Sequence, residues 1–163
     1  MKTVICPGSF DPITNGHMDI IRRASGLFDK VIVVVAYNLE KHGYFTPEER
    51  RDMIMKALSH EDGMKNVTVE LWNGLLVDFV SQKGASAIVK GLRAVSDFEY
   101  EFQMALTNSK LLPGCETIFL TPCAQNMYLS SNIVRQVAGL GGDIHDFVPE
   151  CVLADINNKL LAK

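Results

Sequence analysis

Short apolar runs alternate with amphipathic stretches along the chain, a pattern typical of a parallel sheet covered by helices on both faces. Five of the apolar runs have the length and composition of buried strands. The run 31–36 is apolar at every position, which predicts a central strand buried on both faces. The predicted strands are residues 3–6, 31–36, 67–71, 87–89 and 117–120.

Helical patterns fill the intervals between these strands. The sequence around Thr46 has the signature of a capping box, with Pro47 in the first helical position and Glu49 closing the box. The predicted helices are residues 16–27, 47 to at least 58, 75–83, 97–111, 131–140 and 149 onward. The apolar stripe of the first helix consists of Met18, Ile20, Ile21, Ala24 and Leu27. Further N-caps are predicted at Asp97 and Ser130, and a helix stop at Gly84.

The alternation of strands and helices also predicts the order of the sheet. Right-handed crossovers with one reversal of winding after the third strand give the order 3-2-1-4-5. We therefore predict one domain over residues 1–163 with a doubly wound, Rossmann-like α/β fold and a five-stranded parallel sheet. The first and fourth strands are neighbours where the winding reverses, and ligands of such folds bind beyond the carboxyl ends of the strands at that point.

Composition narrows the class of protein. The net charge of −3 among 163 residues argues against a basic nucleic-acid-binding face. The longest apolar runs are too short to span a bilayer, and the N-terminus lacks a signal-peptide pattern, so no membrane contact is expected. The four cysteines include no Cys-x-x-Cys pair, which fits a reducing compartment. We expect a cytoplasmic protein.

Three polar segments follow the first, fourth and fifth predicted strands. Because these strands are neighbours in the predicted order, the segments should converge on one crevice. Backbone N–H groups at helix starts and cationic side chains are the groups that bind phosphates, so the crevice suits a triphosphate. The segments are Gly8-Ser9-Phe10 with Gly16-His17, Lys90-Gly91-Leu92-Arg93, and Ser130-Ser131-Asn132-Ile133-Val134-Arg135.

Each segment also has a simpler interpretation. His17 could merely cap or pack against its helix, residues 90–93 could form a solvated turn, and residues 130–132 could only be an N-cap run. Lys41, taken alone, reads as a surface lysine. The other histidines lack metal-ligand spacing, and no Gly-x-x-x-x-Gly-Lys-Ser/Thr motif occurs, which argues against a zinc site and a P-loop. The convergence of three segments favours the binding interpretation.

Two of the segments resemble the signatures of the nucleotidylyltransferase superfamily. Residues 14–17, Thr-Asn-Gly-His, resemble its T/H-x-G-H motif, and residues 129–135 resemble its I-S-S-S/T-x-x-R/K motif. Residues 7–12 and 91–101 are similar to one branch, the bacterial phosphopantetheine adenylyltransferases. The resemblance implies adenylyl transfer from ATP to 4′-phosphopantetheine, giving dephospho-coenzyme A and pyrophosphate. It also implies Mg²⁺, a homohexamer and feedback inhibition by coenzyme A.

The resemblance assigns roles to individual residues by matched position. His17 is the implied catalytic residue and would bind the α-phosphoryl oxygens in the transition state. The implied phosphopantetheine contacts are Ser9, Lys41, Leu76 and Lys90. The implied ATP contacts are Ser9, Phe10, His17, Gly91, Leu92, Arg93, Glu101, Asn126, Met127, Tyr128, Leu129, Ser130, Ser131 and Asn132. No protein ligand for Mg²⁺ is implied, since this ion is often held by phosphates and water.

Three positions depart from the pattern of the family. Lys90 stands where arginine is common, Asn126 where an aromatic residue is common, and Asn132 replaces the third serine of its run. Lysine keeps the charge but loses the planar two-point contact of arginine, and Asn126 cannot stack on the nucleotide as an aromatic residue would. For Asn132, which still has hydrogen-bond donors, we expect altered ATP affinity rather than lost activity. Two alternatives stay open: an adenylyltransferase for nicotinamide mononucleotide, and a nucleotide-binding regulator without catalysis.

Overall fold

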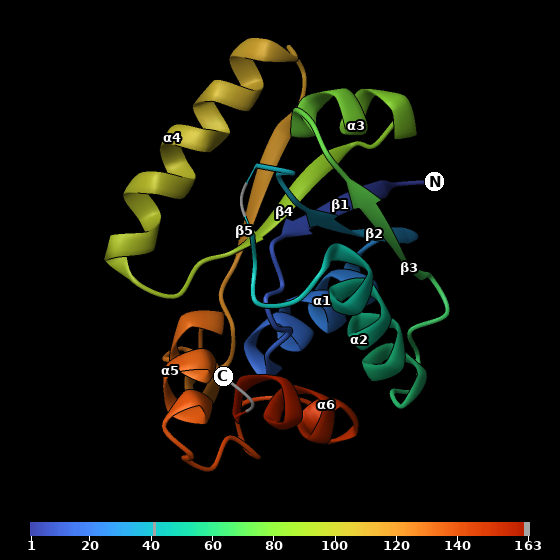
Figure 1. The fold of residues 1–163 in the computed structure, drawn as a ribbon. Coiled ribbons are helices and arrows are strands. Elements are labelled where there is room, and N and C mark those ends of the chain that lie inside the picture. Colours follow the sequence, from blue (N-terminus) through green and yellow to red (C-terminus); the bar gives the residue numbers. More distant parts are fainter. Residues whose placement is uncertain (41, 162–163) are drawn as a thin grey trace.

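The computed structural model describes residues 1–40 and 42–161. The described strands are β1 (Thr3–Gly8), β2 (Lys30–Ala36), β3 (Val67–Trp72), β4 (Ala87–Gly91) and β5 (Glu116–Leu120). The described helices are α1 (Asn15–Leu27), α2 (Pro47–Ser59), α3 (Leu76–Lys83), α4 (Val95–Leu111), the short 3₁₀ turn η1 (Ala124–Asn126), α5 (Ser131–Gly139) and α6 (Glu150–Leu161). Figure 1 shows their arrangement around the sheet.

The sheet is parallel with the order β3-β2-β1-β4-β5, which confirms the predicted topology. β1 occupies the middle and β2 lies beside it as an interior strand, so β2 is buried on both faces without being central. Across the middle of the sheet, Ile5 of β1 lies between Ile32 of β2 and Ile88 of β4. The reversal of winding between β1 and β4 leaves a crevice at their carboxyl ends.

The side chains of each strand alternate between two apolar layers. In β2, Val31, Val33 and Val35 join the larger core with α1, α2, α5 and α6. Ile32 and Val34 join the smaller core with Phe79 of α3 on the opposite face. Two-sided burial of a strand requires apolar residues at consecutive positions, as this run provides.

Local capping explains where several helices begin and end. Thr46 accepts the backbone N–H of Glu49, whose side chain accepts the N–H of Thr46, so the predicted capping box is confirmed. Ser130 caps α5 by accepting the N–H of Ile133, also as predicted. Gly84 ends α3 with φ = 58°, a left-handed conformation that glycine adopts without steric strain.

Three sequence-based expectations were wrong. Leu27 ends α1 with 64% of its surface exposed, because the neighbouring Phe28 packs against the core instead. Asp97 does not cap α4 but pairs with Arg93 from within the first turn. β1 and β4 run beyond their apolar residues, so Lys90 lies inside β4 rather than after it. Backbone pairing continues there because it does not depend on apolar side chains.

Helix α4 lies along the flank of the molecule beside β5 (Figure 1). Many of its apolar side chains face solvent, although the buried Asn108 faces the protein. The exposed members are Phe98, Tyr100, Phe102, Met104, Leu106 and Leu111. Within the described residues, no helix has the length and apolar character needed to cross a membrane.

Two substitutions in α1 test the observed packing. Ile21 is buried, so Ile21→Ala should lower the free energy of unfolding by about 2–5 kcal/mol through lost burial and a residual cavity. Leu27→Ala in the same helix should change it by less than about 0.5 kcal/mol, because Leu27 is exposed. Urea unfolding of both variants measures the difference. Equal losses would contradict the packing described for this helix.

Candidate active site

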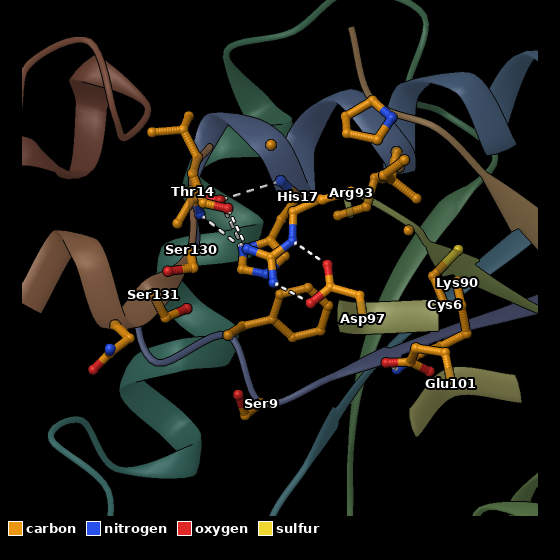
Figure 2. Close-up of a pocket in the computed structure, with 18 of the residues that line it drawn as sticks. Cys6, Ser9, Thr14, His17, Lys90, Arg93, Asp97, Glu101, Ser130 and Ser131 are labelled. Carbon is orange, nitrogen blue, oxygen red and sulfur yellow. Dashed lines mark hydrogen bonds and ion pairs between the residues drawn. The ribbon is translucent and has the colours of Figure 1, made fainter. Parts of the chain in front are cut away.

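A cleft of about 540 Å³ opens at the carboxyl ends of β1 and β4. Its walls come from the loop after β1, the start of α1, the end of β4, the first turns of α4 and the start of α5 (Figure 2). The three polar segments that the sequence analysis singled out therefore meet at one place. The crevice lies where a doubly wound sheet is expected to bind its ligands.

The loop after β1 brings Ser9 and Phe10 to the cleft wall. Phe10 has φ = 48°, a left-handed conformation that non-glycine residues seldom adopt. Its buried ring packs edge-on against the imidazole of His17, with the ring centroids 5.0 Å apart. A Cβ at Gly8 would lie 2.9 Å from the Phe10 ring, so glycine is required for this packing.

Thr14 and His17 form a reciprocal capping box at the start of α1. The Thr14 side chain accepts the backbone N–H of His17, and the Thr14 backbone N–H donates to His17 Nδ1 at 3.1 Å. A backbone N–H can only donate, so Nδ1 must be the unprotonated nitrogen of the ring. In the neutral imidazole the proton is therefore on Nε2, and the ring is a hydrogen-bond donor at that atom.

The surroundings keep His17 neutral. Burial lowers its pKa to about 4, and the positive charges of Arg93 and Lys90 act in the same direction. Cys6 also lines the cleft, and burial raises the pKa of its thiol to about 12 although Lys90 opposes the shift. At neutral pH the cleft therefore contains a neutral imidazole and a protonated thiol, and neither group is an activated nucleophile.

Two cations of the cleft are held by carboxylates of α4. Arg93 makes a two-point contact with Asp97, with N–O distances of 3.0 and 3.2 Å, and its third nitrogen donates to the carbonyl of Leu129. Lys90 Nζ lies 3.2 Å from a carboxylate oxygen of Glu101. These contacts orient long side chains before a ligand arrives, as Figure 2 shows for Arg93 and Asp97.

The start of α5 is joined to the loop after β1. Ser131 Oγ donates to the carbonyl of Pro12 at 2.7 Å, and Arg135 donates to the carbonyl of Asp11 at 2.5 Å. The helix N-terminus therefore faces the cleft in a fixed position, with unpaired N–H groups that favour anions.

A buried ion pair between Asp11 and Arg50 also holds the loop after β1. The carboxylate of Asp11 accepts the backbone N–H groups of Tyr44 and Phe45 at 2.9 and 2.8 Å, and it lies 3.3 Å from Arg50. Arg50 in turn donates to the carbonyls of Phe45 and Ser9. Separating the two side chains would leave an uncompensated buried charge, which is energetically unfavourable. The pair therefore keeps the loop in this position.

A second cavity of about 90 Å³ adjoins the first beneath α4. Lys90 and Glu101 line both cavities, and Leu76 of α3 forms part of the wall of the smaller one. Asn108 of α4 and Thr117 of β5 add polar atoms to this wall. The Thr117 hydroxyl is buried and has no hydrogen-bond partner among the described residues.

The structure gathers most of the predicted site residues. Leu76 lines only the smaller cavity, and Lys41 lies outside the described residues. Leu92, Asn126, Met127 and Tyr128 do not line either cavity, and Tyr128 packs against Phe147. The predicted residues that line the large cleft are Ser9, Phe10, His17, Lys90, Gly91, Arg93, Glu101, Leu129, Ser130, Ser131 and Asn132. Their contacts with ligands stay predictions.

Two glycines of the predicted motifs have packing roles. A Cβ at Gly91 would lie 3.0 Å from Ile20, so glycine at this position lets α1 approach β4 closely. A Cβ at Gly16 would lie 3.4 Å from the carbonyl oxygen of Asn126. Close packing therefore constrains Gly91 more strongly than Gly16, where the distance is that of an ordinary van der Waals contact.

The sequence analysis missed several residues that shape the site. They are Asp11, Arg50, Asp19, Asn108 and Thr117. Pairs such as Asp11 with Arg50 are far apart in sequence and leave no local signal. Asn108 is the exception. A polar residue at a buried position of a helix can be recognised from helical spacing, and it would have indicated a polar contact inside the protein.

The described residues fit Mg²⁺ only as an ion that arrives with phosphates. No group of three or more His, Cys, Asp or Glu side chains among them could hold a metal ion. Asp97 and Glu101 are the described carboxylates of the large cleft, and each already contacts a cation. Mg²⁺ commonly binds through one or two carboxylates together with substrate phosphates, and this donor set matches that mode.

Comparison with known proteins agrees with this geometry. Residues 5–137 match the model of the cytidylyltransferase-like family. The phosphopantetheine adenylyltransferase of Clostridium botulinum strain Eklund 17B is 54% identical over 156 residues, covering 96% of both chains. The enzymes of the same name from Clostridium tetani and Heliobacterium modesticaldum are each 52% identical over 159 residues, covering 98% of this chain and 98% and 93% of theirs.

Solved structures with little sequence identity share the fold. A bifunctional NMN adenylyltransferase/ADP-ribose pyrophosphatase from Francisella tularensis matches 99% of this chain, with 48% of its own chain covered, a TM-score of 0.68 and 18% identity. A proposed nicotinate-nucleotide adenylyltransferase from Vibrio parahaemolyticus matches 98% of this chain and 96% of its own, with a TM-score of 0.65 and 17% identity.

The protonation state of His17 gives a direct test of the site. Because the folded ring has a pKa of about 4, its imidazole nitrogens should show no titration by NMR between about pH 5.5 and pH 8. The stability that the neutral ring provides should be complete above its ordinary pKa of 6.5 and should be lost as the pH falls from 6.5 to about 4.

His145 is an internal reference for this experiment, because its hydrogen bond with Asp143 raises its pKa above the usual value. It should titrate within the window in which His17 does not. A His17 signal that titrates near pH 6.5, or a proton found on Nδ1, would contradict the geometry.

Proposed function

The chain belongs to the phosphopantetheine adenylyltransferase family of nucleotidyltransferases, and we propose that its cleft transfers the adenylyl group of ATP to 4′-phosphopantetheine. The products are dephospho-coenzyme A and pyrophosphate. The observation that carries the proposal is a neutral imidazole fixed as an Nε2–H donor in a cleft that cationic side chains and a helix N-terminus surround.

The acceptor phosphate is an anionic nucleophile and needs no general base. One of its oxygens attacks the α-phosphorus of ATP, the bond from that phosphorus to the bridging oxygen breaks, and pyrophosphate leaves with the electron pair. The task of the protein is to align two anions and to stabilise the charge on the α-phosphoryl oxygens. The protonated thiol of Cys6 is consistent with direct transfer.

His17 is the catalytic residue in this mechanism. Its Nε2–H donates to an α-phosphoryl oxygen as negative charge accumulates there, while Thr14 holds the opposite nitrogen. A neutral donor keeps its proton throughout the reaction. The low pKa of His17 is therefore suited to hydrogen bonding and unsuited to general-acid catalysis at neutral pH.

The cations divide between the two substrates. Arg93 and the N-terminus of α5 hold the β- and γ-phosphates of ATP, while Lys90 and Lys41 orient the phosphate of the acceptor. Asp97 and Glu101 are the carboxylates of the cleft that would contribute to holding Mg²⁺, which when bound with the triphosphate would offset its negative charge. The assignments of Arg93, Lys90 and the start of α5 rest on their positions around one cleft and on the match with the family, whereas that of Lys41 rests on the match alone.

The smaller cavity is the proposed site for the pantetheine arm. It adjoins Lys90, and its wall combines the apolar Leu76 with the polar atoms of Asn108 and Thr117. An arm that carries amide groups on an otherwise apolar chain needs such a mixed surface.

The mature enzyme is proposed to be a cytoplasmic homohexamer subject to feedback by coenzyme A, as the family resemblance implies. The exposed apolar surface of α4 supports an assembly, because a row of aromatic and aliphatic side chains on one helix marks an interaction site. Feedback follows from chemistry, since coenzyme A contains the dephospho-coenzyme A that the cleft releases and competes for the same two cavities.

Pyrophosphate release tests the proposed reaction. The wild-type chain with ATP and Mg²⁺ should release pyrophosphate with 4′-phosphopantetheine and not with nicotinamide mononucleotide. His17→Ala should lower kcat about 10²–10³-fold, because it removes a donor that acts in the transition state, and should bind ATP nearly as well as the wild type. His60→Ala, at an exposed site, is the matched control.

Each alternative result has a distinct meaning. Pyrophosphate release with nicotinamide mononucleotide alone would contradict the proposed acceptor but would leave adenylyl transfer as the reaction. ATP binding without release from either acceptor would favour a regulator without catalysis. Near-normal turnover in His17→Ala would remove this histidine from the chemistry.

The proposed assembly gives a separate prediction. Phe98 and Phe102 stack on the exposed side of α4 with ring centroids 5.4 Å apart, so Phe102→Glu places a charge in the middle of this surface. Sedimentation should then show dissociation of the six-chain species without loss of helix content. Leu140→Glu, at an exposed leucine at the end of α5, should leave the assembly intact. A wild-type monomer, or an unchanged Phe102→Glu assembly, would contradict the proposal.

A further inference from the structure

Asp19 is a charged residue that is buried on α1, among residues of the larger core. It lies on α1 two residues after His17, and only 6% of its surface is exposed. It does not line either cavity described above. A buried carboxylate that touches no ligand site needs a structural explanation, because burial of a charge is unfavourable unless the charge is paired or hydrogen-bonded.

The partner of Asp19 is the backbone of the segment that leads into α5. Asp19 Oδ2 accepts the N–H of Cys123 at 2.6 Å, across 104 positions of sequence. Cys123 begins the segment 123–130, which contains the turn η1 and ends at the N-cap of α5. This segment has little regular structure, so its shape depends on contacts with the body of the protein.

The far end of the segment is held by a different group. Arg93 donates to the carbonyl of Leu129, and Leu129 itself is buried. Between the two anchors, Asn126 donates to the carbonyl of Cys123 and Leu129 donates to the carbonyl of Asn126. The segment is thus a chain of short turns that is fixed at one end by Asp19 and at the other by Arg93.

The carboxylate of Asp19 is ionised at neutral pH. Burial alone would raise its pKa, but the Cys123 N–H and the guanidinium of Arg23 bring the net pKa below the ordinary value. Arg23 lies 3.3 Å from Oδ1 and is largely exposed. The hydrogen bond to Cys123 is therefore charge-assisted, which makes it stronger than a bond between neutral groups.

We propose that Asp19 is a positioning residue for ATP: it joins the segment 123–130 to the helix that carries His17 and so sets the distance between the nucleotide-binding turn and the catalytic imidazole. The inference rests on the proposed function, because the segment contains the predicted ATP contacts from Asn126 to Ser130, of which Leu129 and Ser130 line the large cleft. It assigns to Asp19 an effect on ATP affinity that requires no contact with the nucleotide.

Three variants separate this role from a general effect on stability. Asp19→Ala removes the acceptor for Cys123 and should raise the KM and the Kd for ATP about tenfold, as expected for the loss of one charge-assisted hydrogen bond. Its KM for 4′-phosphopantetheine should stay within about twofold of the wild type. Asp19→Asn keeps a carbonyl oxygen for the Cys123 N–H and should recover most of the ATP affinity.

Arg23→Ala is the matched control, because it removes the closer of the two ion pairs of Asp19, keeps the pair with Arg22 at 3.7 Å, and leaves the bond to Cys123 in place. It should bind ATP like the wild type. Thr46→Ala, which destabilises α2 through loss of its cap, shows what lower stability alone does to both Michaelis constants. Direct ATP binding by calorimetry accompanies the kinetics, so the result does not depend on turnover.

Unchanged ATP affinity in a folded Asp19→Ala variant would overturn the inference. Equal loss of affinity for both substrates would also overturn it, because that result indicates a general structural role. Failure of the proposed function has a different signature: the wild-type chain itself would release no pyrophosphate or would bind no ATP. If Asp19→Ala fails to fold, the Asp19→Asn variant decides. An Asp19→Asn variant that binds ATP about tenfold more weakly than Arg23→Ala would contradict the role of the acceptor.

Discussion

The reciprocal hydrogen bonding between Thr14 and His17 is the constraint on which the site depends. It begins α1 and fixes the orientation of the imidazole with the same two contacts. In the common form of a capping box the residue at this position is Glu or Gln, whose side-chain oxygen accepts the N–H of the N-cap residue. Histidine brings an acceptor at Nδ1 and leaves a donor at Nε2, so the residue that caps the helix also presents a proton to the cleft.

The charges of the site follow from this arrangement. Burial beside Arg93 and Lys90 disfavours protonation of His17, so the positive charge of the cleft resides on those two side chains and not on the imidazole. Asp97 and Glu101 hold those side chains in the absence of a ligand. The phosphates of two substrates then meet cations whose positions are already set, which reduces the ordering required at the moment of reaction.

Local signals in the sequence predicted much of this structure. The capping box at Thr46, the N-cap at Ser130 and the stop at Gly84 depend on residues within one turn, and all three are present. The order of the sheet followed from general rules of handedness. Convergence of the three polar segments then followed from the order, because neighbouring parallel strands end at the same edge.

Long-range contacts account for what the sequence did not reveal. The pairing of Asp11 with Arg50 and the bond from Cys123 to Asp19 join residues far apart along the chain, and neither leaves a periodic pattern. Leu27 is exposed because Phe28 packs against the core at the end of α1, which helical spacing does not determine. Sequence therefore located the reactive groups, whereas their support became visible only in three dimensions.

A crystal structure of the enzyme with bound dephospho-coenzyme A would test the central claim most directly. The account predicts that His17 Nε2 lies within about 2.7–3.2 Å of a non-bridging oxygen on the phosphorus that was transferred, while Nδ1 still accepts the N–H of Thr14. An imidazole turned away from that phosphorus, or one whose bond to Thr14 is broken in the complex, would contradict the account.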